Sequence, residues 1–271
     1  MIDLRTAMVL AAGQGTRMRP LSESVPKPLL RLAGQPLLTH ILDRLEEAGV
    51  ERVVVNAHHL AEQVEAACVA RETPRCEVIV EPVLRGTGGG VLGALPRLQA
   101  LAAESQARAL AAEGVPAEGA LFTEGPWPFA VVNGDSYWLN GPRPALRRLA
   151  ERFEAGEMDG LLLLARSATA EAEVGIGDFA MDPLGRLRRP KEFEVVPYTF
   201  AGVQILHPRL FRDPPEGDAN GAFSLNRLYD RAIEAGRLWG LVHDGAWFHL
   251  SRPADLDHAE ERLAQGLVRF F

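Results

Sequence analysis

The sequence predicts an α/β fold in which a mainly parallel, mixed sheet is sandwiched between helices. Two observations carry this prediction. Strand-like and helix-like patterns alternate over residues 1–172, which is typical of βαβ units. The predicted strands, such as 52–56 and 129–132, are nearly continuous apolar runs without alternation, as expected for strands covered on both faces.

The first strand is the apolar run from Ala7 to Ala12, which ends in the glycine turn 13–20. A helix follows over 36–45, with Pro36 near its start and Gly49 just past its end. The next predicted elements are a strand at 52–56, a helix at 60–70, a strand at 77–80, a helix at 87–98, a strand at 129–132, a helix at 143–155 and a strand at 161–164.

After about residue 172 the texture changes to short strands at 179–181, 186–188 and 198–206, followed by helices at about 223–236 and 253–265. We interpret residues 1–271 as one domain with two halves, 1–172 and 173–271. The Ala- and Glu-rich stretch 99–125 is interpreted as an insert that contains a helix and a loose loop.

Composition excludes several classes of protein. The hydrophobic fraction of 47% and charged fraction of 24% are those of a soluble globular protein. No apolar run is long enough to span a membrane, and no signal peptide is recognisable, so we expect a cytoplasmic protein. Two cysteines are too few for a disulfide framework. The net charge of −7 argues against nucleic-acid binding.

The glycine turn combines backbone freedom with positive charge. Glycines let backbone N–H groups approach a ligand and form a concave anion site, and Arg17 and Lys27 add full charges. Polyphosphate is the ligand that this pattern favours. The turn matches neither G-x-G-x-x-G, because Met18 stands where the third glycine would be, nor the Walker pattern.

Lysine use singles out Lys27. The chain has 29 Lys and Arg residues, of which only Lys27 and Lys191 are lysines. Lys27 lies between Pro26 and Pro28, which predicts a stiff, extended segment that aims the ammonium group. For Lys191, a functional and a purely compositional interpretation stand equal.

Three segments follow predicted strands and are expected to meet at one crevice: 13–19, 87–90 and 133–135. Asp135 is the strongest candidate for a metal ligand, since Mg²⁺ prefers carboxylates together with substrate phosphates; the alternative is a helix N-cap. Glycines 88–90 have no obvious packing reason and are interpreted as functional. His58 and His59 are interpreted as ordinary loop polarity rather than a metal site.

Two motif blocks, L-A-A-G-x-G-T-R-M-x-P at 10–20 and P-K-P-L at 26–29, resemble the sugar-1-phosphate nucleotidyltransferases. Further segments are similar to the N-acetylmuramate α-1-phosphate uridylyltransferase branch, and mannose-1-phosphate guanylyltransferases are less similar. These segments are Glu81-Pro82, 87–90, 132–135, 175–179, 199–203, 207–208, 223–225 and Trp247. The resemblance implies a Rossmann-like, GT-A-like nucleotidyltransferase fold, with nucleotide bound by residues 1–172 and acceptor sugar by 173–271.

The resemblance also implies a reaction, in which a sugar 1-phosphate attacks the α-phosphorus of a nucleoside triphosphate, UTP foremost, and pyrophosphate leaves. Its catalytic residues would be Arg17, Lys27 and Asp135. The cofactor would be Mg²⁺, with Mn²⁺ as an alternative. The nucleotide would be bound by Leu10, Ala11, Ala12, Gly13, Gly15, Thr16, Arg17, Lys27, Thr87 and Gly88; the acceptor sugar by Asn133, Gly177 and Asp178; and the metal by Asp135 and His249.

One segment departs from the family pattern W-x-D-x-G. The segment here is W-F-H-L-S, so His249 stands in the place of the second metal-binding aspartate. Imidazole suits Mn²⁺ or Zn²⁺ better than Mg²⁺. His249 would then ligate a metal, bind phosphate, or mark a lost second site, which leaves a non-catalytic nucleotide-binding regulator as the alternative function. A dinucleotide-dependent oxidoreductase is disfavoured by the incomplete fingerprint. The base, the sugar and the oligomeric state stay open.

Overall fold

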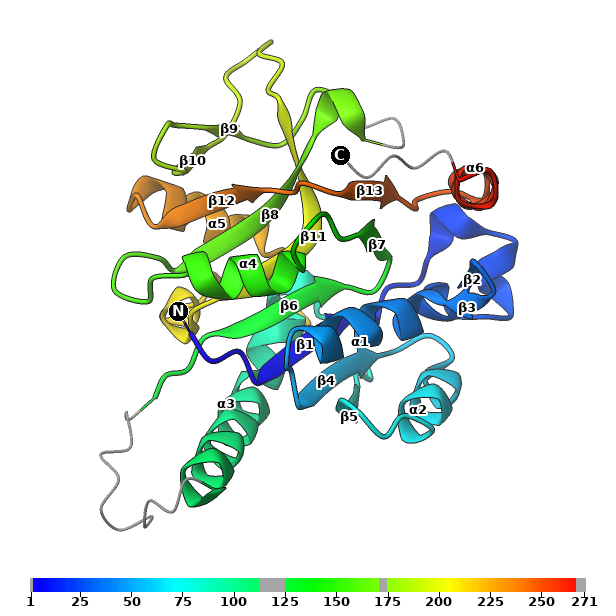
Figure 1. Ribbon diagram of the computed structural model, residues 1–271. Coiled ribbons are helices and arrows are strands. Elements are labelled where there is room, and N and C mark those ends of the chain that lie inside the picture. The colour runs from blue at the N-terminus through cyan, green and yellow to red at the C-terminus, as the bar shows by residue number, and fades with distance from the viewer. Residues whose placement is uncertain (1, 113–124, 171–174, 267–271) are drawn as a thin grey trace.

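A computed structural model describes residues 2–112, 125–170 and 175–266 of the chain (Figure 1). A seven-stranded sheet has the order β12-β8-β11-β6-β1-β4-β5. Strand β11 is antiparallel to both its neighbours, and the other pairs are parallel, so the predicted mixed, mainly parallel sheet is confirmed. The strands are β1 (Thr6–Leu10), β4 (Arg52–Ala57), β5 (Arg75–Val80), β6 (Phe129–Asn133), β8 (Gly160–Arg166), β11 (Tyr198–Leu206) and β12 (Leu238–Val242).

Helices cover both faces of this sheet. One face packs against α1 (Leu37–Glu47), α2 (Ala61–Val69) and α4 (Ala145–Arg152), and their apolar residues share one buried cluster with the sheet. The other face packs against α3 (Gly86–Ala112) and α5 (Asn226–Glu234) in a second cluster. The helical spacing of apolar residues in each helix accounts for this arrangement, because it places them on a single stripe. Within the described residues no helix is long and apolar enough to cross a membrane.

A third apolar cluster lies beside the sheet. It is built from an antiparallel ribbon of β7 (Ser136–Leu139) and β13 (Ala246–His249), together with helix α6 (Pro253–Ala264). Strands β7, β12 and β13, and the short strand pair at 31–32 and 35–36, were not predicted from the sequence. The remaining elements are the hairpins β2 (Arg31–Leu32) with β3 (Gln35–Pro36) and β9 (Ala180–Met181) with β10 (Leu187–Arg188), and the 3₁₀ turns η1 (Thr16–Met18), η2 (Leu21–Glu23), η3 (Lys27–Leu29), η4 (Ser167–Thr169) and η5 (Pro208–Phe211).

Helix α3 corrects the predicted boundary at residue 98. It runs without interruption from Gly86 to Ala112, through Pro96, so the first part of the expected insert is a continuation of the helix. Its buried residues extend to Leu101, Ala102 and Ser105, which keep this part of the helix packed against the sheet. The loop predicted for the rest of the insert lies at 113–124, outside the described residues.

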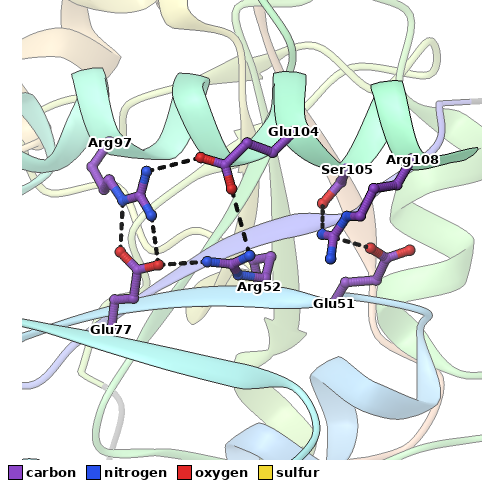
Figure 2. Close-up of polar contacts among 7 residues, drawn as sticks. All are labelled: Glu51, Arg52, Glu77, Arg97, Glu104, Ser105 and Arg108. Atoms are coloured by element: carbon purple, nitrogen blue, oxygen red, sulfur yellow. Dashed lines mark hydrogen bonds and ion pairs between the residues drawn. The ribbon is translucent and has the colours of Figure 1, made fainter.

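Charged side chains also fasten α3 to the strands beneath it, as Figure 2 shows. Glu77 of β5 is central, since its carboxylate contacts Arg97 of α3 at 2.6 Å and Arg52 of β4 at 2.6 Å. Hydrogen bonding from Arg97 above all holds the pKa of Glu77 below its ordinary value. Glu104 joins Arg97 and Arg52, and Arg108 contacts Glu51 and Ser105. A connected group of this kind fixes the helix better than isolated surface pairs would.

Candidate active site

A cavity of about 400 Å³ opens beyond the carboxyl ends of β1, β4 and β6. Its volume lies in the range that holds a small-molecule ligand. The three segments that were expected to converge, 13–19, 87–90 and 133–135, all contribute to its wall. In the second segment only Thr87 lines the cavity, together with the preceding Gly86. Its lining includes Leu10, Ala11, Ala12, Gly13, Gly15, Thr16, Arg17, Met18, Lys27, Pro28, Asn56, Glu81, Leu84, Gly86, Thr87, Asn133, Gly134, Asp135 and Ser251.

The turn after β1 presents unpaired N–H groups to this cavity. Gly15 has a φ of 61° and accepts the Met18 N–H at 2.8 Å, which folds the turn back on itself. Among the described residues, no acceptor pairs with the N–H groups of residues 13–16. A Cβ added at Gly13 would meet no atom within 4 Å, so neither packing nor a positive φ explains this glycine. The turn has the form of an anion-binding nest.

Lys27 and Asp135 form an ion pair on the cavity wall, with 2.5 Å between Nζ and Oδ2. Lys27 is not in an extended segment as expected, because it begins the 3₁₀ turn η3 after an extended Pro26. The helix N-cap alternative for Asp135 is wrong, since strand β7 follows at Ser136. The residue before Asp135, Gly134, donates its N–H to Leu10 O at 2.9 Å, which fixes the acid beside the turn after β1.

A bulge in β11 holds the ribbon that carries Asp135. The register with β8 shifts between Phe200 and Gln204, where Gly202 has a φ of 76°. The Ala201 carbonyl in this bulge accepts hydrogen bonds from Ser136 Oγ at 3.1 Å and from Trp247 Nε1 at 3.0 Å. Both strands of the β7–β13 ribbon are therefore tied to the centre of the main sheet.

His249 pairs with Ser136 across the ribbon, which places it next to the ion pair. Burial lowers the pKa of His249 below its ordinary value, although the nearby Asp135 carboxylate acts in the opposite direction and Lys27 adds to the lowering. The imidazole is half-buried, and it is expected to be neutral at pH 7, the state in which histidine can bind a metal.

Two buried polar residues of the cavity wall, Asn56 and Glu81, were given no site role from the sequence, although Glu81 belongs to a segment similar to the family. Asn56, at the end of β4, accepts the Ala11 N–H at 2.8 Å and donates to Glu81 at 2.7 Å. The Glu81 carboxylate also accepts the Arg85 N–H at 3.2 Å. Asn56 lies near the end of β4, and Glu81 directly follows β5, so both lie where the carboxyl ends of the strands meet. Ligands bind at this place in parallel sheets, and a polar residue at the end of an apolar strand is the sequence signal that could have identified both.

Four predicted site residues do not line the cavity: Gly88, Gly177, Asp178 and His249. The glycine run has a packing reason after all, because a Cβ at Gly88 would lie 2.3 Å from the ring of Phe223. A Cβ at Gly90 would lie 2.9 Å from Asn56 and Glu81.

Gly177 and Asp178 have structural contacts of their own. A Cβ at Gly177 would lie 2.3 Å from Val196 O. Asp178 accepts the Phe200 N–H at 2.9 Å, beside the bulge. The histidines His58 and His59 hydrogen-bond to the carbonyls of Glu81 and Ser22, in agreement with their interpretation as loop polarity.

The donor set fits a divalent cation that takes part of its coordination from a substrate. Within the described part of the chain, no three or more His, Cys, Asp or Glu side chains gather into a metal site. Asp135 has a side chain that is 38% exposed, so its carboxylate is accessible from the cavity. One carboxylate combined with phosphate oxygens is an arrangement that Mg²⁺ accepts.

Comparison with known proteins identifies the family. Residues 7–170 match the MobA-like NTP transferase domain. The chain belongs to this family. The resemblance to sugar-1-phosphate nucleotidyltransferases is confirmed by two relatives that match nearly the whole chain. The N-acetylmuramate alpha-1-phosphate uridylyltransferase of Caulobacter vibrioides is 36% identical over 96% of this chain and 98% of its own. The protein of the same name from Neisseria meningitidis is 30% identical over 94% and 96%.

Solved structures confirm the nucleotidyltransferase fold. A UDP-glucose pyrophosphorylase complexed with UDP-glucose superposes with a TM-score of 0.73 at 16% identity, over 97% of this chain and 100% of that one. A putative glucose-1-phosphate thymidylyltransferase from Bacillus anthracis gives 0.71 at 16% identity, over 95% and 94%. At this identity the likeness concerns the fold alone.

Proposed function

We propose that this chain transfers a uridylyl group from UTP to N-acetylmuramic acid 1-phosphate and releases pyrophosphate. The observation that carries the proposal is the meeting, in one cavity, of the unpaired N–H groups of residues 13–16 with the Lys27–Asp135 pair. Two relatives that match nearly the whole chain and bear this activity in their names support the choice of substrates.

The turn after β1 would bind the β- and γ-phosphates. Its N–H groups have no acceptor among the described residues, so they are available to an anion. Arg17 is exposed beside them, and within the described part of the chain its side chain makes no hydrogen bond or ion pair. Phosphate oxygens would therefore replace only water at these donors. Such donors act without reorganisation when charge develops on the leaving pyrophosphate.

Lys27 would neutralise the α-phosphate and the incoming phosphate of the sugar. Its ammonium group is held by Asp135 and by the turn η3, so its position is set before substrate binds. Holding both reactants beside one fixed cation supplies the alignment that an in-line displacement needs. Asn133, at the end of β6, lines the same cavity and would hydrogen-bond the acceptor. Gly177 and Asp178 lie outside the cavity lining and would contact the acceptor sugar farther from its phosphate.

Asp135 would hold Mg²⁺ together with phosphate oxygens, and the neighbouring His249 would complete the site. A cation bound there would polarise the α-phosphate and orient both reactants. The imidazole in place of a second carboxylate leaves the site less negative and makes Mn²⁺ a good substitute. We further propose a cytoplasmic location, in keeping with the free thiols of Cys68 and Cys76.

Pyrophosphate release tests the proposal. The protein is incubated with Mg²⁺, each of UTP, GTP, CTP, ATP and dTTP, and a panel of sugar 1-phosphates that includes N-acetylmuramic acid 1-phosphate. Release is expected to be fastest with UTP and this sugar, and Asp135→Asn is expected to lower kcat by about 10²–10³-fold. The control Asp257→Asn removes an exposed acid of α6 and should leave the rate unchanged.

Two other outcomes have their own meaning. Preference for GTP and mannose 1-phosphate would replace the proposal by the guanylyltransferase alternative. Tight triphosphate binding with no turnover of any pair, even after His249→Asp, would replace it by a nucleotide-binding regulator.

A further inference from the structure

Ser251 is a cavity residue that the proposed mechanism does not use. It is the last residue of the segment W-F-H-L-S and stands in the place of the glycine in the family pattern W-x-D-x-G. It follows β13 by two residues, and the ribbon register places this end of β13 beside Asp135, because His249 pairs with Ser136. Ser251 lines the same cavity as Thr16, Arg17 and Met18 of the turn after β1. Its own N–H is held by Asp255 Oδ2 at 2.8 Å, which fixes the backbone.

The hydroxyl of Ser251 lacks a partner. The residue is 5% exposed, and among the described residues no group makes a hydrogen bond with its Oγ. A buried hydroxyl without a partner is unfavourable, so such groups are uncommon in folded proteins. Because Ser251 forms part of the cavity wall, the missing partner must come from whatever occupies the cavity.

The surroundings decide the chemical nature of that partner. The cavity wall that includes Ser251 also carries Arg17, Lys27 and residues of the turn after β1. Three carboxylates belong to these surroundings and each already has a partner: Asp135 is paired with Lys27, Glu81 accepts from Asn56, and Asp255 accepts the N–H of Ser251. An occupant of this part of the cavity is therefore an anion with several acceptor oxygens. A hydroxyl can donate to such an oxygen, and hydrogen bonds to charged acceptors are the stronger ones.

We propose that Ser251 donates a hydrogen bond to a phosphate oxygen of the triphosphate bound at the turn after β1, and retains this bond to the pyrophosphate that leaves. This inference rests on the proposed function, since it names the residue that recognises the leaving group. The triphosphate is favoured over the phosphate of the acceptor sugar because Ser251 lines the cavity together with Thr16 and Arg17, which belong to the turn proposed to bind the triphosphate.

The test measures pyrophosphate binding directly. Mg²⁺ with pyrophosphate is titrated into the wild-type protein and into Ser251→Ala and Ser251→Gly, and KM values are measured for UTP and sugar 1-phosphate in the forward reaction and for pyrophosphate in the reverse one. Both variants are expected to raise the Kd and KM of pyrophosphate and the KM of UTP by about tenfold or more. The KM of the sugar 1-phosphate should stay within about twofold.

Ser105→Ala is the matched control, because it removes another buried serine hydroxyl, on α3 and away from the cavity. It should leave all these constants unchanged. Unchanged pyrophosphate binding in the Ser251 variants, an effect in only one of them, or an effect shared with or confined to the sugar 1-phosphate would overturn the inference. A clear fall in the Tm of Ser251→Ala would also overturn it, since the hydroxyl would then have an internal partner.

Failure of the proposed function would give a different experimental result from failure of the Ser251 inference. In that case the wild-type protein itself turns over no triphosphate and sugar phosphate pair. Pyrophosphate binding by the wild-type and variant proteins can still be compared in the titration.

Discussion

Replacing each partner of the Lys27–Asp135 pair should give two inactive variants of unequal stability. The side chain of Lys27 is 11% exposed and that of Asp135 is 38% exposed. In Asp135→Asn a mostly buried ammonium keeps its charge and loses its anionic partner, whereas Lys27→Met leaves a carboxylate that water can still reach. Breaking a fully buried pair costs about 3–5 kcal/mol, and an exposed pair is worth about 1 kcal/mol or less.

We therefore expect Asp135→Asn to lower the free energy of unfolding by about 2 kcal/mol and Lys27→Met by less than about 1 kcal/mol. Urea denaturation at pH 7 measures both, and the larger loss corresponds to a fall in Tm of roughly 4–8 °C. Lys191→Met, which replaces the other lysine of the chain at an exposed position, should lie within about 0.5 kcal/mol of wild type. Equal losses, or a larger loss in Lys27→Met, would refute the reasoning.

Further predictions concern glycines, pH and metal. Gly88→Ala should destabilise the protein by about 1–3 kcal/mol in urea, because its Cβ would overlap the ring of Phe223. Gly13→Ala should keep wild-type stability and raise the Kd of UTP in calorimetry roughly tenfold, equal to about 1.4 kcal/mol; a stability loss at Gly13 would contradict this. Burial lowers the pKa of His207 to about 4, so the unfolded state binds the extra proton first and stability should fall as pH drops from about 6.5 to 4. The free energy of unfolding should fall by roughly 3 kcal/mol at most over this pH range. Urea denaturation of His207→Gln should show a free energy of unfolding that depends less on pH over the same range. EDTA should abolish pyrophosphate release without lowering Tm, because no three or more metal-binding side chains gather among the described residues; a fall in Tm would indicate a resident ion.

Much of the site followed from the sequence because strand ends and site residues coincide. The turn after β1, Thr87, Asn133 and Asp135 line one cavity, as predicted from their places after apolar strands. Lys27, which was singled out by the scarcity of lysine and by its flanking prolines, lines the same cavity. A parallel sheet brings the carboxyl ends of its strands together, so the meeting of these distant segments could be predicted from the strand pattern alone, without knowledge of any single contact.

Other features depend on contacts that no local pattern contains. The ribbon of β7 and β13 joins segments more than a hundred residues apart, and each strand has only four residues. The reason for the glycine at position 88 is the ring of Phe223, which comes from the far half of the chain. The extent of α3 was underestimated because its Ala-rich second half shows little apolar contrast. That half is fixed by the Glu77 charges and by buried residues such as Leu101.

The length of α3 separates its two ends by about 40 Å at 1.5 Å per residue. Gly86 and Thr87 of its first turn border the cavity, whereas Ala111 and Ala112 at its other end are exposed. The charged contacts of Figure 2 lie between them and hold the helix in place from Arg97 to Arg108. A fluorophore or surface tether attached at Ala111 would thus be mechanically coupled to the molecule while leaving substrate access free, which makes this helix end a suitable handle for single-molecule or immobilised assays.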